Sequence, residues 1–305
     1  MNSIIISVDD AVLEKMKNFY SDKATFMDEG AVLFRAEEDG CMITARRDKR
    51  ILFKGNNAKK IADRWQAAKK PVQEMTSGMF MHSHIGSDDV GNNDYFGPIC
   101  TVACYVDEKD IDWLVHLDIH DVKTLPNQEV IRLARLIKDK LKYSLLILDN
   151  PHYNKMVNEG LNPANIKARL HNQAITNVIQ RIDGTCQTKV IEHFVSPKTF
   201  YNYLKNEVIV VKDLKFETDS YNHYLAMSCA HLLARYASLQ YFNNMSRKLN
   251  TRLPYGSTAA VDRVAVELVL GHGEAILNKV AKKHFTNTKR VLDEARQKAH
   301  LKNQK

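Results

Sequence analysis

The stretch that most constrains this 305-residue chain is residues 85–106, which begins Ile-Gly-Ser-Asp-Asp-Val-Gly-Asn-Asn-Asp-Tyr-Phe-Gly-Pro. Two adjacent carboxylates, Asp88 and Asp89, follow a short apolar segment, and a turn rich in glycine and asparagine precedes a run typical of a strand. Neighbouring side chains on a strand point to opposite faces. We nevertheless expect the following glycines to bend the chain so that both carboxylates reach one site at the sheet edge. Paired carboxylates suit Mg²⁺, whereas an isolated Asp-Asp-x-Gly match is more often a solvated turn.

Length, charge and cysteine content limit the class of protein. A chain of 305 residues favours two domains, and a formal net charge of +8 suits a polyanionic partner such as nucleic acid or an anionic membrane surface. No apolar run approaches a membrane span, and the first residues lack the basic start of a signal peptide. We therefore expect a cytoplasmic protein without a membrane anchor. Five cysteines without a Cys-x-x-Cys pair favour buried, reduced thiols over a zinc site or disulfides.

Residues 1–68 predict a small α+β unit. The expected elements are strands at 3–8, 31–36, 42–46 and 50–54, with helices at 11–20 and 55–65. Residues 69–84 lack clear periodicity and form the predicted linker. His82 and His84 lie in it without further ligands at a recognisable spacing, so we do not expect them to bind a metal.

From residue 85 onward, strand and helix patterns alternate. The predicted strands are 99–106, 144–148, 188–194 and 208–211, the predicted helices 127–142, 162–181, 198–205 and 220–243, and a turn is expected at 150–154. This alternation indicates an α/β sheet covered by helices.

The whole segment 85–98 resembles the signature of the type 3 ribonucleases H (ribonuclease HIII), Gly-Ser-Asp-Glu-x-Gly followed by Asp-Tyr-Phe-Gly-Pro. Further blocks resemble this family in the same order: Asn150-Pro151-x-Tyr153-Asn154, Lys167-Ala168-x-Leu170-His171-Asn172, Ala234-Arg235-Tyr236, Leu253-Pro254-x-Gly256 with Val261-Asp262, and Lys282-x-His284-Phe285-x-Asn287-Thr288. The amino-terminal unit is similar to the family's TATA-binding-protein-like domain through Ile43-Thr44-Ala45 and Leu52-Phe53-Lys54-Gly55. The resemblance implies a ribonuclease H-like mixed sheet for residues 85–305, with carboxy-terminal helices.

The chemistry implied by the resemblance is hydrolysis of the RNA strand of an RNA–DNA hybrid by two Mg²⁺ or Mn²⁺ ions held by four carboxylates. Asp88 matches the family's first acid. Asp89 stands where the family has Glu, and Glu192 stands where it has Asp. These three residues are the expected metal ligands.

The fourth acid of the family is a Glu, and Tyr221 takes its place here. Asp219 and Glu217 are the nearest acids, and a neutral tyrosine is a poor ligand for Mg²⁺. The expected catalytic set is therefore Asp88, Asp89, Glu192 and Asp219.

Substrate contacts are likewise implied by the resemblance. A protein distinguishes RNA from DNA through the 2′-hydroxyl, and the family positions that read it match Gly91, Asn92, Asn93 and Tyr95, with Asn93 replacing a usual glycine. Lys123 fits a phosphate contact. In the amino-terminal unit, Arg46, Arg47 and Arg50 are either a solvated strand face or a patch that follows the phosphate backbone; the resemblance favours the second.

Two functions remain open. The first is a metal-dependent ribonuclease H, and the second is a catalytically weakened or inactive hybrid-binding protein that keeps the fold and the basic surfaces. Each Asp/Glu exchange changes reach by roughly 1–1.5 Å, and a misplacement of about 1 Å can cost a hundredfold in rate. We expect Asp88, Asp89 and Glu192 to converge within metal-bridging distance, in a monomer without an obligate partner.

Overall fold

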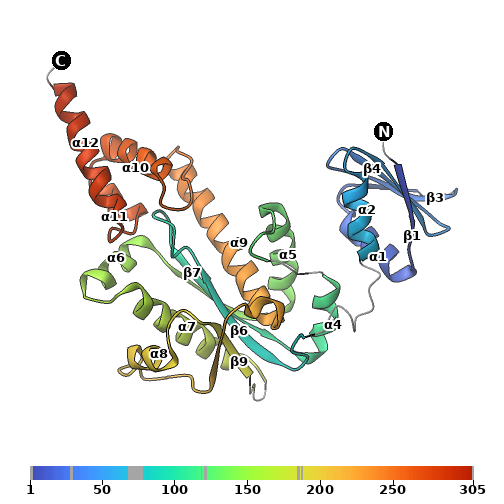
Figure 1. Cartoon of the computed structure of the whole chain (residues 1–305), viewed down its shortest axis with the longest axis horizontal. Coiled ribbons are helices and arrows are strands. Elements are labelled where there is room, and N and C mark those ends of the chain that lie inside the picture. Colours follow the sequence, from blue (N-terminus) through green and yellow to red (C-terminus); the bar gives the residue numbers. More distant parts are fainter. Residues whose placement is uncertain are drawn as a thin grey trace. The chain divides into compact units, whose positions relative to one another are not determined.

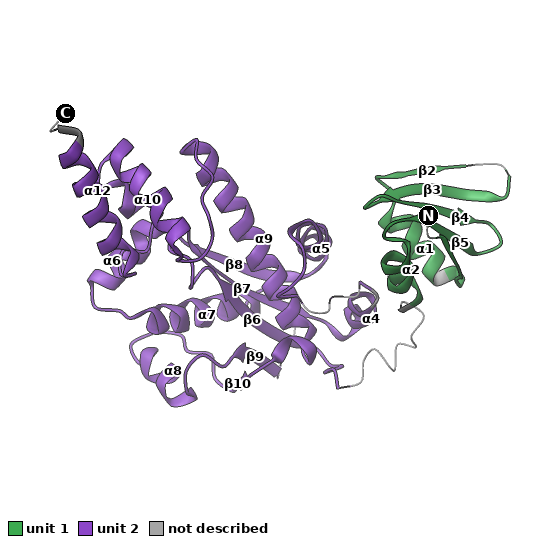
Figure 2. Cartoon of the chain, turned by 45° about the horizontal axis from the view of Figure 1, so that its top comes forward, with its two compact units in different colours: residues 1–77 green, residues 78–305 purple. Residues whose placement is uncertain are grey.

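A computed structural model describes residues 3–27, 30–67, 78–117, 119, 122–183, 186 and 188–303. The chain divides into two compact units, Met1–Ser77 and Gly78–Lys305 (Figure 2). Residues 69–77 of the predicted linker lie outside the described residues. The remainder of that linker belongs to the second unit, where the backbone amide of Phe80 donates to the carbonyl of His223 at 2.7 Å.

The first unit is a five-stranded antiparallel sheet with two helices on one face (Figure 1). Its strands run in the order β1-β5-β4-β3-β2: β1 Ser3–Ser7, β5 Arg50–Gly55, β4 Cys41–Arg46, β3 Val32–Glu38 and β2 Ala24–Phe26. The helices are α1 Asp10–Phe19 and α2 Ala58–Ala67. Alternate strand residues, among them Phe34, Ile43 and Phe53, are buried under the helices with Trp65. The predicted α+β domain is confirmed; the short strand β2 was not expected.

The second unit is built on a mixed sheet, as predicted. The strand order is β10-β9-β6-β7-β8: β10 Leu214–Glu217, β9 Thr188–Glu192, β6 His84–Val90, β7 Ile99–Val106 and β8 Lys142–Leu148. β10, β9 and β6 are parallel, whereas β6, β7 and β8 are antiparallel. Helices and one 3₁₀ turn (η1) surround it: α4 Glu108–His116, α5 Asn127–Lys140, α6 Asn150–Asn158, α7 Pro163–Ile179, α8 Pro197–Tyr203, η1 Ser220–Asn222, α9 Leu225–Lys248, α10 Ala259–His272, α11 Ile276–Val280 and α12 Asn287–Asn303.

Strand β6 is covered by a different helix on each face. Gly86 lies against the backbone of α9, where a Cβ atom would collide with the amide nitrogen of Met227. On the opposite face, Ile85 packs in a cluster with Ala168 and Ile175 of α7. Even-numbered residues of β6 therefore face α9 and odd-numbered residues face α7, which fixes the direction of every side chain on the strand.

The carboxy-terminal helices hold the turn that follows β6. α10, α11 and α12 form one cluster with Tyr95, Phe96 and Phe242. The buried ammonium of Lys282 donates to the carbonyls of Asp94 at 2.8 Å and Gly97 at 2.6 Å. The turn is therefore shaped by residues almost 200 positions further along the chain.

Two predicted elements are wrong, and a third begins later than predicted. Residues 150–154 begin helix α6 instead of forming a turn, because Asp149 caps the helix by accepting from the amide of His152. Residues 208–211 are not a strand, since Asn172 bonds their backbone at Ile209 and Val211; the outer strand is β10 instead. The predicted helix 220–243 starts as η1 and becomes α9 only at Leu225.

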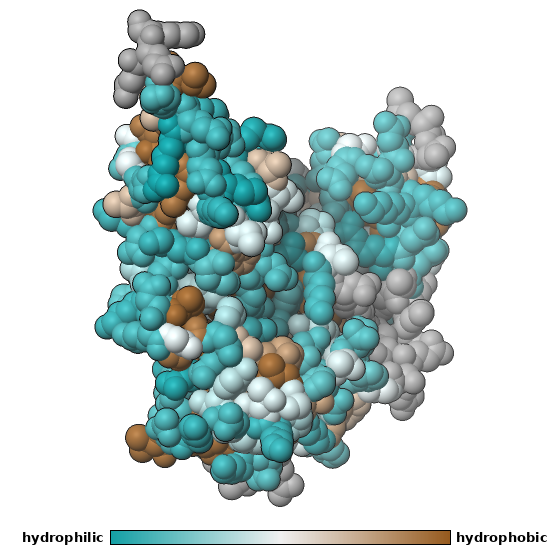
Figure 3. Space-filling model, turned by 60° about the vertical axis from the view of Figure 1, so that its left-hand side comes forward, coloured by the Kyte–Doolittle hydropathy of each residue, from teal (hydrophilic) through white to brown (hydrophobic). Residues whose placement is uncertain are grey.

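The surface is mainly hydrophilic where Figure 3 shows it, and hydrophobic side chains there form small, separate patches. Among the described residues, no helix has the length and apolar character needed to cross a membrane. The five cysteines are free thiols; Cys186 is half-buried and the other four are buried.

Candidate active site

Asp88 and Glu192 lie on one face of the sheet, at the ends of neighbouring parallel strands. Ser87 of β6 pairs with Ile191 of β9, and each acid follows that pair by one residue. Both acids therefore project on the α9 side. Two carboxylates of one face thus meet at the carboxyl end of β9, beside η1 and the start of α9.

Asp88 is nearly buried, and an imidazole and a phenol lie around it. His231 of α9 places Nδ1 at 2.7 Å from Oδ2 of Asp88. The ring of Tyr221 packs edge-on against His231. Burial, and then the charges of Asp88 and Glu192, raise the pKa of Tyr221, so its phenol stays neutral. The residue at the fourth acidic position therefore does not supply negative charge.

Glu192 is held by Ser220, whose hydroxyl donates to Oε2 at 2.8 Å. Lys123 lies between Glu192 and Tyr221, with Nζ at 3.8 Å from Oε1 of Glu192 and 4.3 Å from the ring centroid of Tyr221. Arg235 of α9 fixes the segment that carries Lys123, because its guanidinium donates to the carbonyl of Val122 at 3.1 Å. The ammonium of Lys123 therefore lies beside the carboxylate of Glu192.

Asp89 points the other way, toward α7. One carboxylate oxygen, Oδ1, accepts from Lys167 at 2.9 Å and from His171 at 3.0 Å; the other, Oδ2, accepts from the side-chain amide of Asn92. Burial alone would raise the pKa of Asp89, but the hydrogen bond from His171 and the charge of Lys167 outweigh it and lower the pKa. Asp89 is therefore a paired, ionised group on the opposite face from Asp88.

The geometry fits one hard divalent cation better than two. Asp88 and Glu192 offer two carboxylates on one face, which is a donor set that Mg²⁺ or Mn²⁺ accepts. Within the described part of the chain, no three His, Cys, Asp or Glu side chains come close enough together to hold a metal ion. The expected convergence of Asp88, Asp89 and Glu192 is therefore not seen: the glycines bend the chain after β6, too late to bring Asp89 to the other face. Asp219 is exposed in a left-handed turn with φ 53°.

The glycine-rich turn begins at Gly91, directly after strand β6. Gly91 has φ 100°, and a side chain there would strike the Pro98 carbonyl. Asn93 is exposed and is not among the residues with positive φ, so its replacement of a glycine costs no backbone strain. Tyr95 is buried, and its hydroxyl lies 3.0 Å from that of Thr288.

The arginines of the first unit have local partners. Arg46 and Arg50 lie on the sheet face away from the helices, and both approach Asp48, at 3.6 Å and 2.6 Å. Arg47 donates to the carbonyls of Gly30 and Met27.

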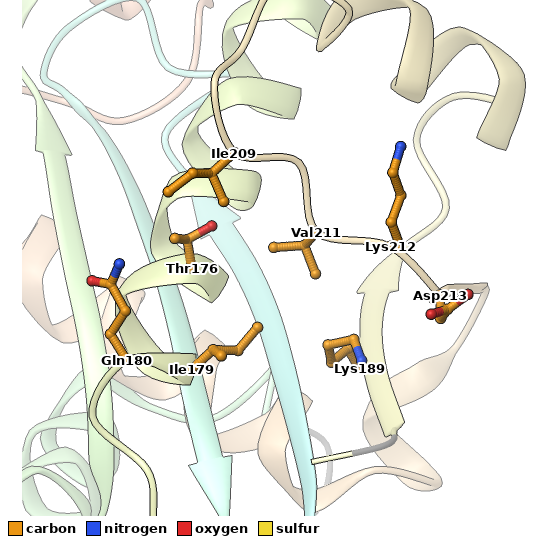
Figure 4. A pocket seen from close by; sticks show the side chains of 8 residues that line it. All are labelled: Thr176, Ile179, Gln180, Lys189, Ile209, Val211, Lys212 and Asp213. Carbon is orange, nitrogen blue, oxygen red and sulfur yellow. The ribbon is translucent and has the colours of Figure 1, made fainter. Parts of the chain in front are cut away.

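A cavity without any expected catalytic residue lies elsewhere in the second unit. It has a volume of about 350 Å³ and is lined by α7, the start of β9 and residues 209–213 (Figure 4). Lys189 lines it, three residues before Glu192 on β9, and none of the expected catalytic residues does.

His231, Lys167 and His171 were not expected to contact the acids. Lys167 and His171 stood in a block noted only for its family resemblance, and their helical spacing of four places both on one face of α7. His231 carried no signal of its own in the sequence, since only the packing of α9 on β6 brings it to Asp88.

Known proteins are similar to this chain over most of its length. The family described as Ribonuclease HII matches residues 85–288, and a domain of unknown function, DUF3378, matches residues 3–77. Ribonuclease HIII of Bacillus licheniformis is 35% identical, with 95% of this chain and 98% of that protein covered. Ribonuclease HIII of Bacillus subtilis is 34% identical, with 95% and 97% covered. The crystal structure of Bst-RNase HIII in complex with Mn²⁺ is 28% identical, with a TM-score of 0.70 and 97% and 100% covered.

Proposed function

The chain belongs to the ribonuclease HIII family, a family of endonucleases, and from this premise we propose that it hydrolyses the RNA strand of RNA–DNA hybrids with Mg²⁺ or Mn²⁺. The observation that carries the proposal is the pair Asp88 and Glu192 on one sheet face, with Lys123 beside it. This is the combination of carboxylates and a cation that phosphodiester hydrolysis requires.

Each residue has a proposed role. Asp88 and Glu192 would hold a divalent cation, and Lys123 would bind a phosphate oxygen of the substrate. Divalent cations, when bound, lower the pKa of an attacking water and neutralise charge on the leaving 3′ oxygen. His231 orients Asp88, and Ser220 orients Glu192, so that neither carboxylate has to be reorganised when substrate arrives. Water adds to the phosphorus as the bond to the 3′ oxygen breaks, which leaves a 5′-phosphate and a 3′-hydroxyl.

Recognition of the RNA strand is proposed for the turn after β6. The backbone amides of Gly91, Asn92 and Asn93 would contact the 2′-hydroxyl. Tyr95 is placed beneath them, and with its hydroxyl on Thr288 it would support the turn from within. In the first unit, Arg46 and Arg50 are proposed to bind phosphates of the hybrid, whereas Arg47 is engaged by backbone carbonyls.

A two-cation mechanism would also need Asp89, and Asp219 would have to serve as the fourth acid. Asp89 is paired on the opposite face of the sheet, and Tyr221, at the position of the fourth acid, is neutral. These two observations favour the alternative function, a weakened or inactive hybrid-binding protein. We propose the cytoplasm as its location, where the free cysteines would stay reduced, and a monomer as its form.

The test is incubation of the full chain with a hybrid labelled on its RNA strand, in Mg²⁺ and in Mn²⁺. Cleavage that Asp88→Asn abolishes supports the enzyme. A variant that combines Asp89→Glu, Glu192→Asp and Tyr221→Glu restores the acids of the family. Hybrid binding without cleavage, followed by cleavage in that variant, would establish the hybrid-binding protein instead.

A further inference from the structure

We infer that His223 is a positioning residue for the proposed hydrolysis. It fastens the anchor segment (residues 78–80, directly after the linker) to the turn η1, and this turn holds the carboxylate of Glu192. The inference rests on the proposed function, because Glu192 belongs to its site. It adds a residue that touches neither the carboxylates nor the substrate but on which the rate depends.

The turn η1 has little support of its own. It spans three residues between β10 and α9, and of these only Ser220 is buried. Asp219, directly before it, has a left-handed backbone with φ 53°. Non-glycine residues keep such a conformation only where the surrounding structure enforces it. The hydroxyl of Ser220 can therefore hold Oε2 of Glu192 at 2.8 Å only if other parts of the chain fix the turn.

Two hydrogen bonds join His223, at the end of η1, to the anchor segment. The amide of Phe80 donates to the carbonyl of His223 at 2.7 Å. In the opposite direction, Nδ1 of His223 lies 2.9 Å from the carbonyl oxygen of Gly78 and donates to it, because a carbonyl can only accept. The amide of His223 in turn donates to the carbonyl of Ser220 at 3.2 Å. A continuous path of hydrogen bonds therefore runs from the anchor segment through His223 and Ser220 to Glu192.

The ring of Phe80 fixes the anchor segment. It packs against Tyr224, the residue before α9, with ring centroids 5.6 Å apart, and against buried His84 of β6 at 5.4 Å. Nζ of Lys215, on β10, lies 5.4 Å from the centroid of the same ring. The anchor segment is therefore held by elements on both sides of η1, and it can act as a fixed support for the turn.

The consequence for the reaction lies in the two groups that contact Glu192. Ser220 donates to Oε2, whereas Nζ of Lys123 lies 3.8 Å from Oε1. If η1 is released, the hydroxyl of Ser220 moves away and the carboxylate turns toward the ammonium of Lys123. Misplacement of a catalytic group by about 1 Å can cost a hundredfold in rate. The surfaces that bind the hybrid stay intact, so kcat should fall while KM is retained.

The experiment is steady-state cleavage, by the full chain, of a hybrid labelled on its RNA strand. His223→Leu removes the donor to Gly78 and should lower kcat roughly tenfold with an unchanged KM. His223→Gln keeps a side-chain N–H donor and should restore most of kcat. His272→Leu changes an exposed histidine of α10, and this matched control should cleave like the unmodified chain.

Two further measurements separate positioning from a general loss of structure. Ser220→Ala removes the hydroxyl through which His223 acts, so His223→Leu should lower kcat no further in that background. Amide hydrogen exchange of residues 220–226, in the full chain without nucleic acid, should be faster in His223→Leu than in the unmodified chain or in His223→Gln.

The outcomes distinguish this inference from the proposed function. With cleavage by the unmodified chain, an unchanged kcat in His223→Leu would overturn the inference alone. The same holds for unchanged hydrogen exchange, for a glutamine variant as slow as the leucine variant, and for an equal further loss in the Ser220→Ala background. An unmodified chain that cleaves no hybrid would overturn the proposed function and the inference with it.

Discussion

Protonation of His84 should uncouple the start of α9 from the sheet. His84 is fully buried on β6, and its Nε2 accepts from the amide of Ala226 at 3.0 Å. Its Nδ1 lies 2.7 Å from the carbonyl oxygen of His82 and donates to it. Only a neutral imidazole can donate with one nitrogen and accept with the other. Both ring nitrogens of His84 are therefore engaged by the backbone.

The magnitude follows from the shift in pKa. Burial lowers the pKa of His84 from 6.5 to about 4, although the bond to His82 acts in the opposite direction. The unfolded chain therefore binds the proton more tightly than the folded chain. The contribution of His84 to the free energy of unfolding is complete above pH 6.5 and is lost as the pH falls toward 4. The loss reaches about 3.4 kcal/mol below pH 4.

The assay is urea unfolding from pH 7 to pH 4, followed by the fluorescence of Trp113 in the same unit, for the unmodified chain and for His84→Gln. The glutamine keeps an acceptor for Ala226 but cannot be protonated. At pH 7 the unmodified chain should be the more stable, and the difference in unfolding free energy should shrink by about 3 kcal/mol at pH 4. Exposed His152→Gln should leave the profile unchanged. A difference that does not vary with pH would refute the reasoning.

Three further predictions concern the scaffold and the substrate. Burial lowers the pKa of Lys282 to about 8. The free energy of unfolding should therefore rise between pH 8 and 10.5, because in this range the unfolded chain retains the proton that the folded chain has lost. In urea unfolding, Lys282→Met should abolish this rise and should cost about 1–3 kcal/mol at pH 7. Arg235→Gln should raise KM for a hybrid more than it lowers kcat in steady-state kinetics, because Lys123 loses its support; an unchanged KM would contradict this role. Deletion of residues 1–77 should weaken hybrid binding and reduce its salt dependence in a fluorescence-anisotropy titration. If neither changes, Arg46 and Arg50 form only a solvated face.

Local signals predicted most of the fold. The antiparallel strands of the first unit and the long core helix carry clear patterns of alternation and apolar content, and they were found within a few residues. The strand expected at 208–211 failed for a non-local reason, because a single side chain, Asn172, satisfies that backbone in place of a ladder. The start of α6 was missed although Asp149 followed by Asn150-Pro151 is a recognisable helix start.

Only part of the candidate site could be predicted from local sequence. The family resemblance singled out Asp88 and Glu192 as metal ligands, and the register of β6 with β9 brings them to one face. The direction of Asp89 was set by the alternation of the strand, and the expected bend did not overcome it. Its partner Lys167 lies 78 residues away, and the contact depends on how α7 packs across the sheet, which no local pattern encodes.

The central claim is that the carboxylates of Asp88 and Glu192 form the cation site of this nuclease. Crystals of the unmodified chain soaked in MnCl₂ would test it most directly, through an anomalous difference map collected at the manganese edge. The predicted result is one strong peak between these two carboxylates on the α9 face. A peak that bridges Asp88 and Asp89 instead, or none beside Glu192, would contradict it.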